Sequence, residues 1–214
     1  QLATRLMAIN SEFHLGQLMK HGFEKQEYFV KLLKIQGEMT DLPIYIDDTP
    51  GITIYDLYMK ARMWKRKYDI KILFVDYIQL MSGESKNGNR EQEIAVISRK
   101  LKHLAKELNI PVVALSQLSR QVEARTDKRP RLSDLRESGA IEQDADVVIF
   151  IYRPEYYNDI PTPELTSTGG NTEIIFAKYR SGSLETKALY WQGDKTKFMD
   201  PEDYYVHSKT GVVF

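Results

Sequence analysis

A carboxylate follows a short apolar segment near residue 75. Ile72–Val75 is unbroken, apolar and contains β-branched residues, which predicts a strand covered on both faces, as in a parallel sheet. The segment ends at Asp76, and ligands of open α/β sheets lie beyond the carboxyl ends of the strands. An acid there can hold a magnesium ion, directly or through water, against nucleotide phosphates. The alternative is an aspartate that only caps the following turn.

A second predicted strand, Val112–Leu115, also ends in polar residues, Ser116 and Gln117. Parallel strands deliver such residues to the same sheet edge, so we expect Asp76 and Gln117 at one site. The phosphate-binding strings G-x-x-x-x-G-K-[ST] and G-x-G-x-x-G are both absent from the sequence. The residues alone therefore predict half of a nucleotide site.

A basic segment spans residues 120–136, with six basic residues against three acidic ones. It contains Arg125 and Arg129 but no aromatic residue, which favours contact with a phosphodiester backbone over base stacking. At its end, Gly139 lies close to Arg136 and Glu137, and a glycine lets backbone N–H groups approach a phosphate closely. The alternative is a solvated surface loop.

Two cations lie near the tip of a predicted hairpin. The segments 172–178 and 185–192 alternate like antiparallel strands, and they enclose Lys178 and Arg180. Side chains two residues apart project to the same side of a strand, so both could reach an anion on a neighbouring subunit, as an arginine finger does. The alternative is a hairpin whose charges prevent edge pairing.

The elements around these residues predict an α/β fold. Predicted parallel strands are centred on residues 45, 74, 114 and 149, the first of them being Pro43–Asp47. Helices separate them, of which Glu91–Asn109 has the clearest apolar face, and Thr53 caps the start of another. We expect a mostly parallel sheet with an antiparallel terminal hairpin, and a loop over residues 153–171.

The composition excludes several classes of site and partner. The sequence has 30 basic and 30 acidic residues, so a nucleic acid must be met by a local patch. It has no cysteine, its four histidines lack metal-ligand spacing, and no apolar run approaches the ~20 residues of a membrane span. A soluble, cytoplasmic protein without membrane contact is expected. Residues 1–9 already have a helical pattern, so we expect a piece of a longer protein.

The motifs taken together resemble those of the bacterial replicative DNA helicase family, the DnaB type. The resemblance covers residues 1–198 and rests on five segments in the family's order: Phe74–Met81, Ala114–Arg120, Asp127–Pro130, Asp134–Asp146 and Ala177–Gly182. It implies a RecA-like P-loop ATPase core, with residues 1–198 as the motor domain and 199–214 as a carboxyl-terminal tail.

The resemblance also implies an activity and a set of roles. The activity is ATP-driven unwinding of duplex DNA at the replication fork by a homo-hexameric ring around single-stranded DNA, with ATP and Mg²⁺ as cofactors and with a primase and a helicase loader as partners in the replisome. Asp76 is the Walker B acid, Gln117 senses the γ-phosphate, and Lys178 and Arg180 reach the neighbouring subunit. Single-stranded DNA contacts are implied for Arg136, Glu137 and Gly139, to which the basic segment adds Arg125 and Arg129.

The Walker A loop and the catalytic glutamate of that family precede the position of Gln1, so we expect this chain alone to be inactive. Two alternatives stay open. One is a related RecA-like ATPase of recombination or repair, and the other is a non-catalytic DNA-binding or ring-assembly module.

Overall fold

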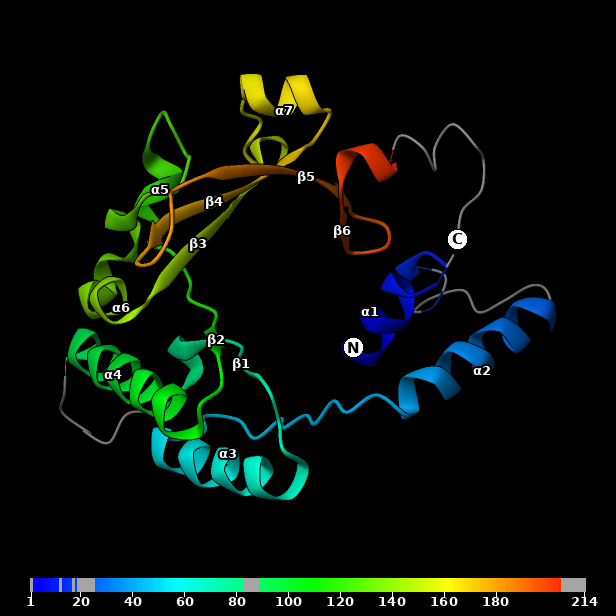
Figure 1. The fold of residues 1–214 in the computed structure, drawn as a ribbon. Helices are drawn as coiled ribbons and strands as arrows, with labels where there is room; N and C mark the ends of the chain where they lie inside the picture. Colours follow the sequence, from blue (N-terminus) through cyan, green and yellow to red (C-terminus); the bar gives the residue numbers. More distant parts are fainter. Residues whose placement is uncertain (1, 12, 17, 19–25, 83–88, 205–214) are drawn as a thin grey trace. The chain divides into compact units, whose positions relative to one another are not determined.

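The computed structural model describes residues 2–11, 13–16, 18, 26–82 and 89–204. Its helices and strands are shown in Figure 1. In chain order they are α1 (Leu2–Ile9), α2 (Gln26–Thr40), α3 (Ile54–Tyr68), β1 (Leu73–Val75), η2 (Ile78–Leu80), α4 (Arg90–Leu108), β2 (Val112–Ala114), α5 (Gln121–Ala124), η3 (Leu132–Ser138), α6 (Gly139–Asp144), β3 (Val147–Tyr152), η4 (Pro154–Tyr157), α7 (Pro163–Thr168), β4 (Thr172–Tyr179), β5 (Thr186–Gln192) and β6 (Lys197–Met199). Among the described helices, none is long and apolar enough to cross a membrane.

The chain divides into two compact units. The first comprises Gln1–Ile46, Ile151–Ile174 and Thr186–Phe214, and the second comprises Asp47–Phe150 and Ile175–Glu185. The division passes through β3 and β4, because the two ends of each strand belong to different units. Every residue that the sequence predicts for a site belongs to the second unit.

Two capped helices form the core of the second unit. The hydroxyl of Thr53 accepts the Asp56 N–H at 3.1 Å and thereby starts α3, as its sequence predicts. Asn89 caps the start of α4 in the same way, and Asn109 ends it in the left-handed conformation (φ 51°). The apolar faces of both helices pack with β1 in one cluster, in which Ile94, Ile97, Leu101 and Leu104 are buried.

Strands β1 and β2 pair in parallel, with Leu73 opposite Val112 and Val75 opposite Ala114. Leu73 and Val75 are buried in the cluster formed with α3 and α4. Phe74, which points to the other face, is 63% exposed. The prediction of a strand covered on both faces is therefore wrong for the described residues, because the helices α3 and α4 cover only the face that carries Leu73 and Val75.

The remaining strands form a second sheet in the order β3-β4-β5-β6, and β5 and β6 are antiparallel. β3 contains the predicted strand centre at residue 149, and β4 and β5 form the predicted hairpin. The α/β class is thus confirmed, although the strands lie in two sheets instead of one. The predicted strand Pro43–Asp47 is wrong: its residues have no strand partner in the described part of the chain, and Ile44 and Ile46 are exposed.

The first unit contains more structure than its sequence suggests. The predicted loop 153–171 includes η4 and α7, and Thr162 caps α7 by accepting the Leu165 N–H. Beyond β6, Tyr204 stacks on Tyr190, with ring centroids 3.5 Å apart. This contact packs the start of the predicted tail, whose residues 205–214 lie outside the described part. The boundary at residue 198 stays a prediction.

Candidate functional site

The polar residues that follow β1 and β2 meet at one edge of the parallel pair. Leu115 N–H donates to the Val75 carbonyl at 2.9 Å, and Ile78 N–H donates to the Leu115 carbonyl at 3.0 Å, which extends the pairing beyond both strands. The peptide bond between Asp76 and Tyr77 is cis. Asp76 and Gln117, both exposed, therefore leave the sheet at the same end, as predicted.

Gln79 joins the two strand ends through its side-chain amide. Its Nε2 donates to Ser116 Oγ at 2.9 Å, and its Oε1 accepts the Gln117 N–H at 3.2 Å. Arg90, at the start of α4, donates from Nη2 to the Gln79 carbonyl at 2.6 Å. We did not single out Gln79 or Arg90 from the sequence, because neither contact is local. A glutamine three residues after a strand-ending acid was the only available signal.

The edge supplies one carboxylate and several neutral oxygen atoms as possible ligands. No group of three or more His, Cys, Asp or Glu residues that could hold a metal occurs in the described part of the chain. Magnesium, however, is commonly held by one or two carboxylates together with waters and substrate phosphates. The lone carboxylate of Asp76 fits that mode of binding and does not form a closed metal site.

Arg125 holds the basic segment together through hydrogen bonds within that segment, and we call its contacts with Asp134 the clamp. Its Nη1 and Nη2 atoms each donate to one carboxylate oxygen of Asp134 at 2.9 Å. The same guanidinium donates to the carbonyls of Asp127 and Arg129, at 3.2 and 3.0 Å. Asp134 is 5% exposed and also accepts the Arg131 N–H at 2.7 Å. The Arg125 guanidinium is thus occupied by the loop that contains it.

The other residues predicted to bind DNA follow Arg125 in the sequence. Arg129 is half-buried, and its N–H donates to Asp127 Oδ1 at 3.0 Å. This N–H, and next the Arg131 side chain, hold the pKa of Asp127 below its usual range. Arg136 and Glu137 lie in η3, but their side chains are outside the described part. Gly139 starts α6 with ordinary helical angles (φ −50°), and a Cβ there would meet no atom within 4 Å.

The two hairpin cations contact the end of α6. Lys178 Nζ donates hydrogen bonds to the carbonyls of Glu142 and Gln143. Arg180 donates from Nη2 to the Gln143 carbonyl at 2.7 Å and from Nη1 to Asp146 Oδ1 at 3.3 Å. Among the described contacts, none joins Lys178 or Arg180 to Asp76 or Gln117. The structure therefore forms two groups of predicted residues, one at the strand ends and one at the hairpin.

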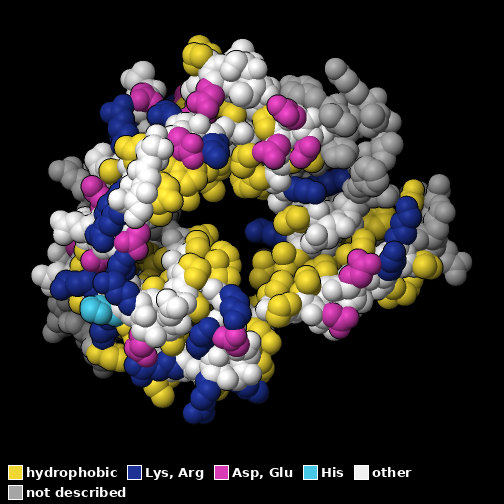
Figure 2. Space-filling view, in the orientation of Figure 1, with side chains coloured by type: hydrophobic (Ala, Val, Ile, Leu, Met, Phe, Trp, Pro, Cys, Tyr) yellow, Lys and Arg dark blue, Asp and Glu magenta, His cyan; other side chains and the backbone are white. Residues whose placement is uncertain are grey.

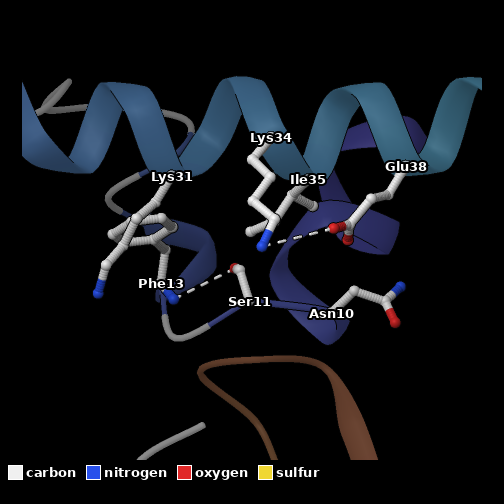
Figure 3. A pocket seen from close by; sticks show the side chains of 7 residues that line it. All are labelled: Asn10, Ser11, Phe13, Lys31, Lys34, Ile35 and Glu38. Carbon is white, nitrogen blue, oxygen red and sulfur yellow. Dashed lines mark hydrogen bonds and ion pairs between the residues drawn. The ribbon is translucent and has the colours of Figure 1, made fainter.

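A pocket of about 200 Å³ lies between α2 and the residues that follow α1, in the first unit (Figure 3). Phe13 N–H donates to Ser11 Oγ at 3.2 Å on one side of it, and Lys34 lies 3.9 Å from Glu38 on the other. The pocket contains none of the residues predicted for chemistry. Its mixed lining does not indicate a particular ligand.

Basic side chains outnumber acidic ones along α3 and α4, and side chains of both signs lie on their surface (Figure 2). Arg62, for example, pairs with Glu107 at 2.6 Å. The basic segment 120–136 remains the predicted contact with nucleic acid.

An α/β fold that brings polar residues to the carboxyl ends of neighbouring parallel strands defines the class of the chain: it is built like proteins that bind nucleotides at a sheet edge. The profile of the family described as DnaB-like helicase C terminal domain matches residues 1–200. The chain therefore belongs to the family of DnaB-like helicase C-terminal domains, which confirms the resemblance seen in its motifs.

Several curated relatives are similar over nearly the whole chain. The replicative DNA helicase DnaB of Rickettsia bellii (strain RML369-C) is 43% identical over 226 residues, which cover 98% of this chain and 45% of that protein. The replicative DNA helicase DnaC of Bacillus subtilis (strain 168) is 42% identical over 203 residues, which cover 94% of this chain and 43% of that protein. The chain thus spans slightly less than half the length of these relatives.

Two solved structures confirm the fold class. One, described as a DnaB-like replicative helicase and its interactions with primase, has a TM-score of 0.82 and 37% identity, and the match covers 92% of this chain and 46% of that one. The other, described as an ATPase domain, has a TM-score of 0.82 and 38% identity over 92% of this chain and 68% of that one.

Proposed function

We propose that this chain is part of the motor of a replicative DNA helicase, which uses ATP to unwind duplex DNA at the replication fork. The observation that carries the proposal is the meeting of Asp76 and Gln117 at one end of a parallel strand pair, in a chain that belongs to the DnaB-like family.

At that edge, Asp76 acts as the Walker B acid, which holds Mg²⁺ through a water molecule. A magnesium ion held there would supply positive charge against the phosphates of bound ATP. Gln117 senses the γ-phosphate, and the Gln79 amide keeps its backbone aligned with the end of β1. Because Gln79 follows β1 and its amide contacts Ser116 and Gln117 at the end of β2, a change at one strand end is passed to the other.

Lys178 and Arg180 act on the ATP of a neighbouring subunit, within a homo-hexameric ring. Two observations support this role. In the described contacts of the chain they stay apart from Asp76 and Gln117, and the Arg180 side chain is 50% exposed, so it is accessible to a second molecule. Arginine fingers supplied by a partner stabilise the negative charge of the transition state.

Arg136, Glu137 and Gly139 hold single-stranded DNA through its backbone, with Arg129 as an additional cation. The lack of a side chain at Gly139 lets a phosphate approach the backbone N–H groups closely. We assign Arg125 an indirect part in DNA binding, because four hydrogen bonds occupy its guanidinium. It shapes the loop that presents its neighbours.

The complete gene product would meet a primase and a helicase loader at the replisome on the nucleoid. A similar solved structure is described with its interactions with primase, and that description supports the first of these partners. This chain by itself we expect to be inactive, since hydrolysis needs a phosphate cradle that its residues do not supply.

The test is ATP hydrolysis by rings assembled from equal amounts of the Arg180→Ala and Asp76→Asn variants of the complete gene product. Rings of either variant alone lose at least ~100-fold in rate, but a finger that acts on the next subunit restores hydrolysis in the mixed rings, because about one interface in four then combines an intact Asp76 with an intact Arg180 of the neighbour. Arg62→Ala, which removes another exposed arginine, is the control and leaves the rate unchanged. Mixed rings that stay as inactive as either variant alone would refute the assignment in trans.

The two alternative functions predict other outcomes for the same protein. A recombination or repair ATPase would hydrolyse ATP on DNA without separating the strands of a forked duplex. A non-catalytic module would bind single-stranded DNA and show no hydrolysis at all.

A further inference from the structure

The hairpin that carries Arg180 is fixed to one short segment, Glu142–Asp146, by contacts of three kinds. The Arg180 N–H donates to the Asp146 carbonyl at 2.9 Å. Its guanidinium contacts the Asp146 carboxylate and the Gln143 carbonyl. Lys178 adds the carbonyls of Glu142 and Gln143. Arg180 is thus held by a backbone carbonyl, a carboxylate and a helix-end carbonyl, whereas Lys178 is held by helix-end carbonyls alone.

The electrostatics of this segment favour cations. The last carbonyls of a helix have no partner within the helix and carry partial negative charge, which Glu142 and Gln143 offer at the end of α6. Asp146 adds a full charge. Its pKa is held below its usual range, first by the hydrogen bond from Lys102, then by the charges of Lys102 and Arg180. The carboxylate is therefore ionised at neutral pH.

These contacts hold Arg180 without covering it, since half of its side chain remains exposed. Asp146 is 57% exposed as well. Exposed ion pairs contribute little to global stability. The pair is therefore suited to aiming the guanidinium rather than to holding the fold together.

The same helix connects to the predicted DNA loop. η3, which contains Arg136 and Glu137, ends at Ser138, and α6 starts at the next residue, Gly139. α6 has six residues, so about 9 Å of helix separates the loop from the carbonyls that hold the cations. A shift of the loop on binding DNA would displace these carbonyls and Asp146 together.

We propose that Asp146 is a positioning residue for Arg180, and that α6 passes the state of the DNA loop to the hairpin through it. The inference rests on the proposed role of Arg180 toward the neighbouring subunit. It adds a residue that touches neither ATP nor DNA but sets the rate at which DNA stimulates hydrolysis.

The experiment compares DNA-stimulated ATP hydrolysis by the complete gene product and its variants Asp146→Asn, Asp146→Glu and Asp144→Asn. We expect Asp146→Asn to lower the DNA-stimulated kcat about tenfold, with less than twofold change in KM for ATP and in Kd for single-stranded DNA. Asp146→Glu keeps the charge and restores part of kcat. Asp144→Asn removes a neighbouring charge whose Oδ2 has no hydrogen-bond partner among the described residues, and leaves kcat unchanged.

A second comparison separates positioning from a structural role. If Asp146 acts through Arg180, adding Asp146→Asn to an Arg180→Lys protein changes kcat less than twofold, whereas independent effects multiply. Multiplying effects, or an Asp146→Asn protein with wild-type kcat while Arg180→Ala is inactive, would overturn the inference and leave the proposed function intact. Full activity of Arg180→Ala would instead overturn the finger assignment itself.

Discussion

Replacing Asp134 by Asn tests whether the clamp in the basic segment shapes the DNA loop. The substitution keeps the side-chain shape and one oxygen for the Arg131 N–H, but removes the charge that Arg125 contacts with two nitrogens at 2.9 Å. The Asp134 side chain is 6% exposed and that of Arg125 is 28% exposed. The variant therefore leaves the largely buried Arg125 guanidinium without its carboxylate partner.

The free energy lost on Asp134→Asn follows from this burial. Removing one partner of a buried ion pair costs about 3–5 kcal/mol. Arg125 keeps its contacts with the carbonyls of Asp127 and Arg129, and water reaches part of it. We therefore expect about 2 kcal/mol, which corresponds to roughly a 30-fold increase in the opening equilibrium of the loop.

Hydrogen exchange of residues 119–138 in the complete gene product measures this opening directly. Asp127→Asn is the matched control: Asp127 also accepts a backbone N–H and an arginine, but its side chain is 55% exposed. An exposed pair of this kind is worth about 0.5 kcal/mol or less. We expect fast exchange for Asp134→Asn alone. Equal exchange in the two variants, or wild-type exchange in Asp134→Asn, would show that the clamp does not hold the loop.

Three further results are expected. Arg136→Ala weakens single-stranded DNA binding and lowers the magnitude of the slope of log K against log salt by about one, since one phosphate contact is lost. Binding titrations at several salt concentrations measure this slope, and an unchanged slope would count against the contact. Leu104→Ala lowers the unfolding free energy by about 3 kcal/mol, because Leu104 is fully buried. Val96 is 42% exposed on the same helix, so Val96→Ala lowers it by less than about 0.5 kcal/mol. Thermal melts compare the two variants, and similar melting temperatures would contradict the core assignment. Hydrogen bonds from Lys60 and then Thr49 lower the pKa of Asp47 to about 2. The carboxylate therefore stabilises the fold above its unfolded pKa of about 4 and loses that contribution, about 1 kcal/mol after allowance for solvent screening, as the pH falls toward 2. Acid titration checks this, because the Asp47→Asn variant lacks this pH dependence.

The sequence alone predicts most elements of the second unit because their signals are local. Thr53 caps α3 through a residue three positions away, and α4 keeps one apolar face over 19 residues. The strand ends at Asp76 and Gln117 followed from apolar runs that stop on polar residues. Such signals need no knowledge of what lies far away in the chain.

Features that depend on distant partners were missed or mistaken. Pro43–Asp47 has the composition of a strand, but a strand also needs a neighbour for its backbone hydrogen bonds. The exposed face of β1 could not be foreseen, since an apolar run does not tell how many of its faces are covered. The Gln79 amide bridge and the contacts of Arg180 with Asp146 join residues 34 or more positions apart, and no periodicity reveals them.

The occupied state of the Arg125 guanidinium also could not be predicted from the sequence, which groups Arg125 with the other residues predicted to contact DNA. A count of basic residues does not distinguish a cation that faces solvent from one that is occupied within its own loop. The nearest signal in the sequence was Asp134, nine residues away, which is too far for a local pattern to connect.

Strand separation of a forked duplex by the complete gene product, with and without ATP, tests the central claim most directly when the Asp76→Asn variant is measured beside it. We expect unwinding that requires ATP and is lost in Asp76→Asn, while that variant still binds single-stranded DNA as tightly as the wild type. Unwinding that persists at the wild-type rate in Asp76→Asn, or no ATP-dependent unwinding by the wild type, would contradict it.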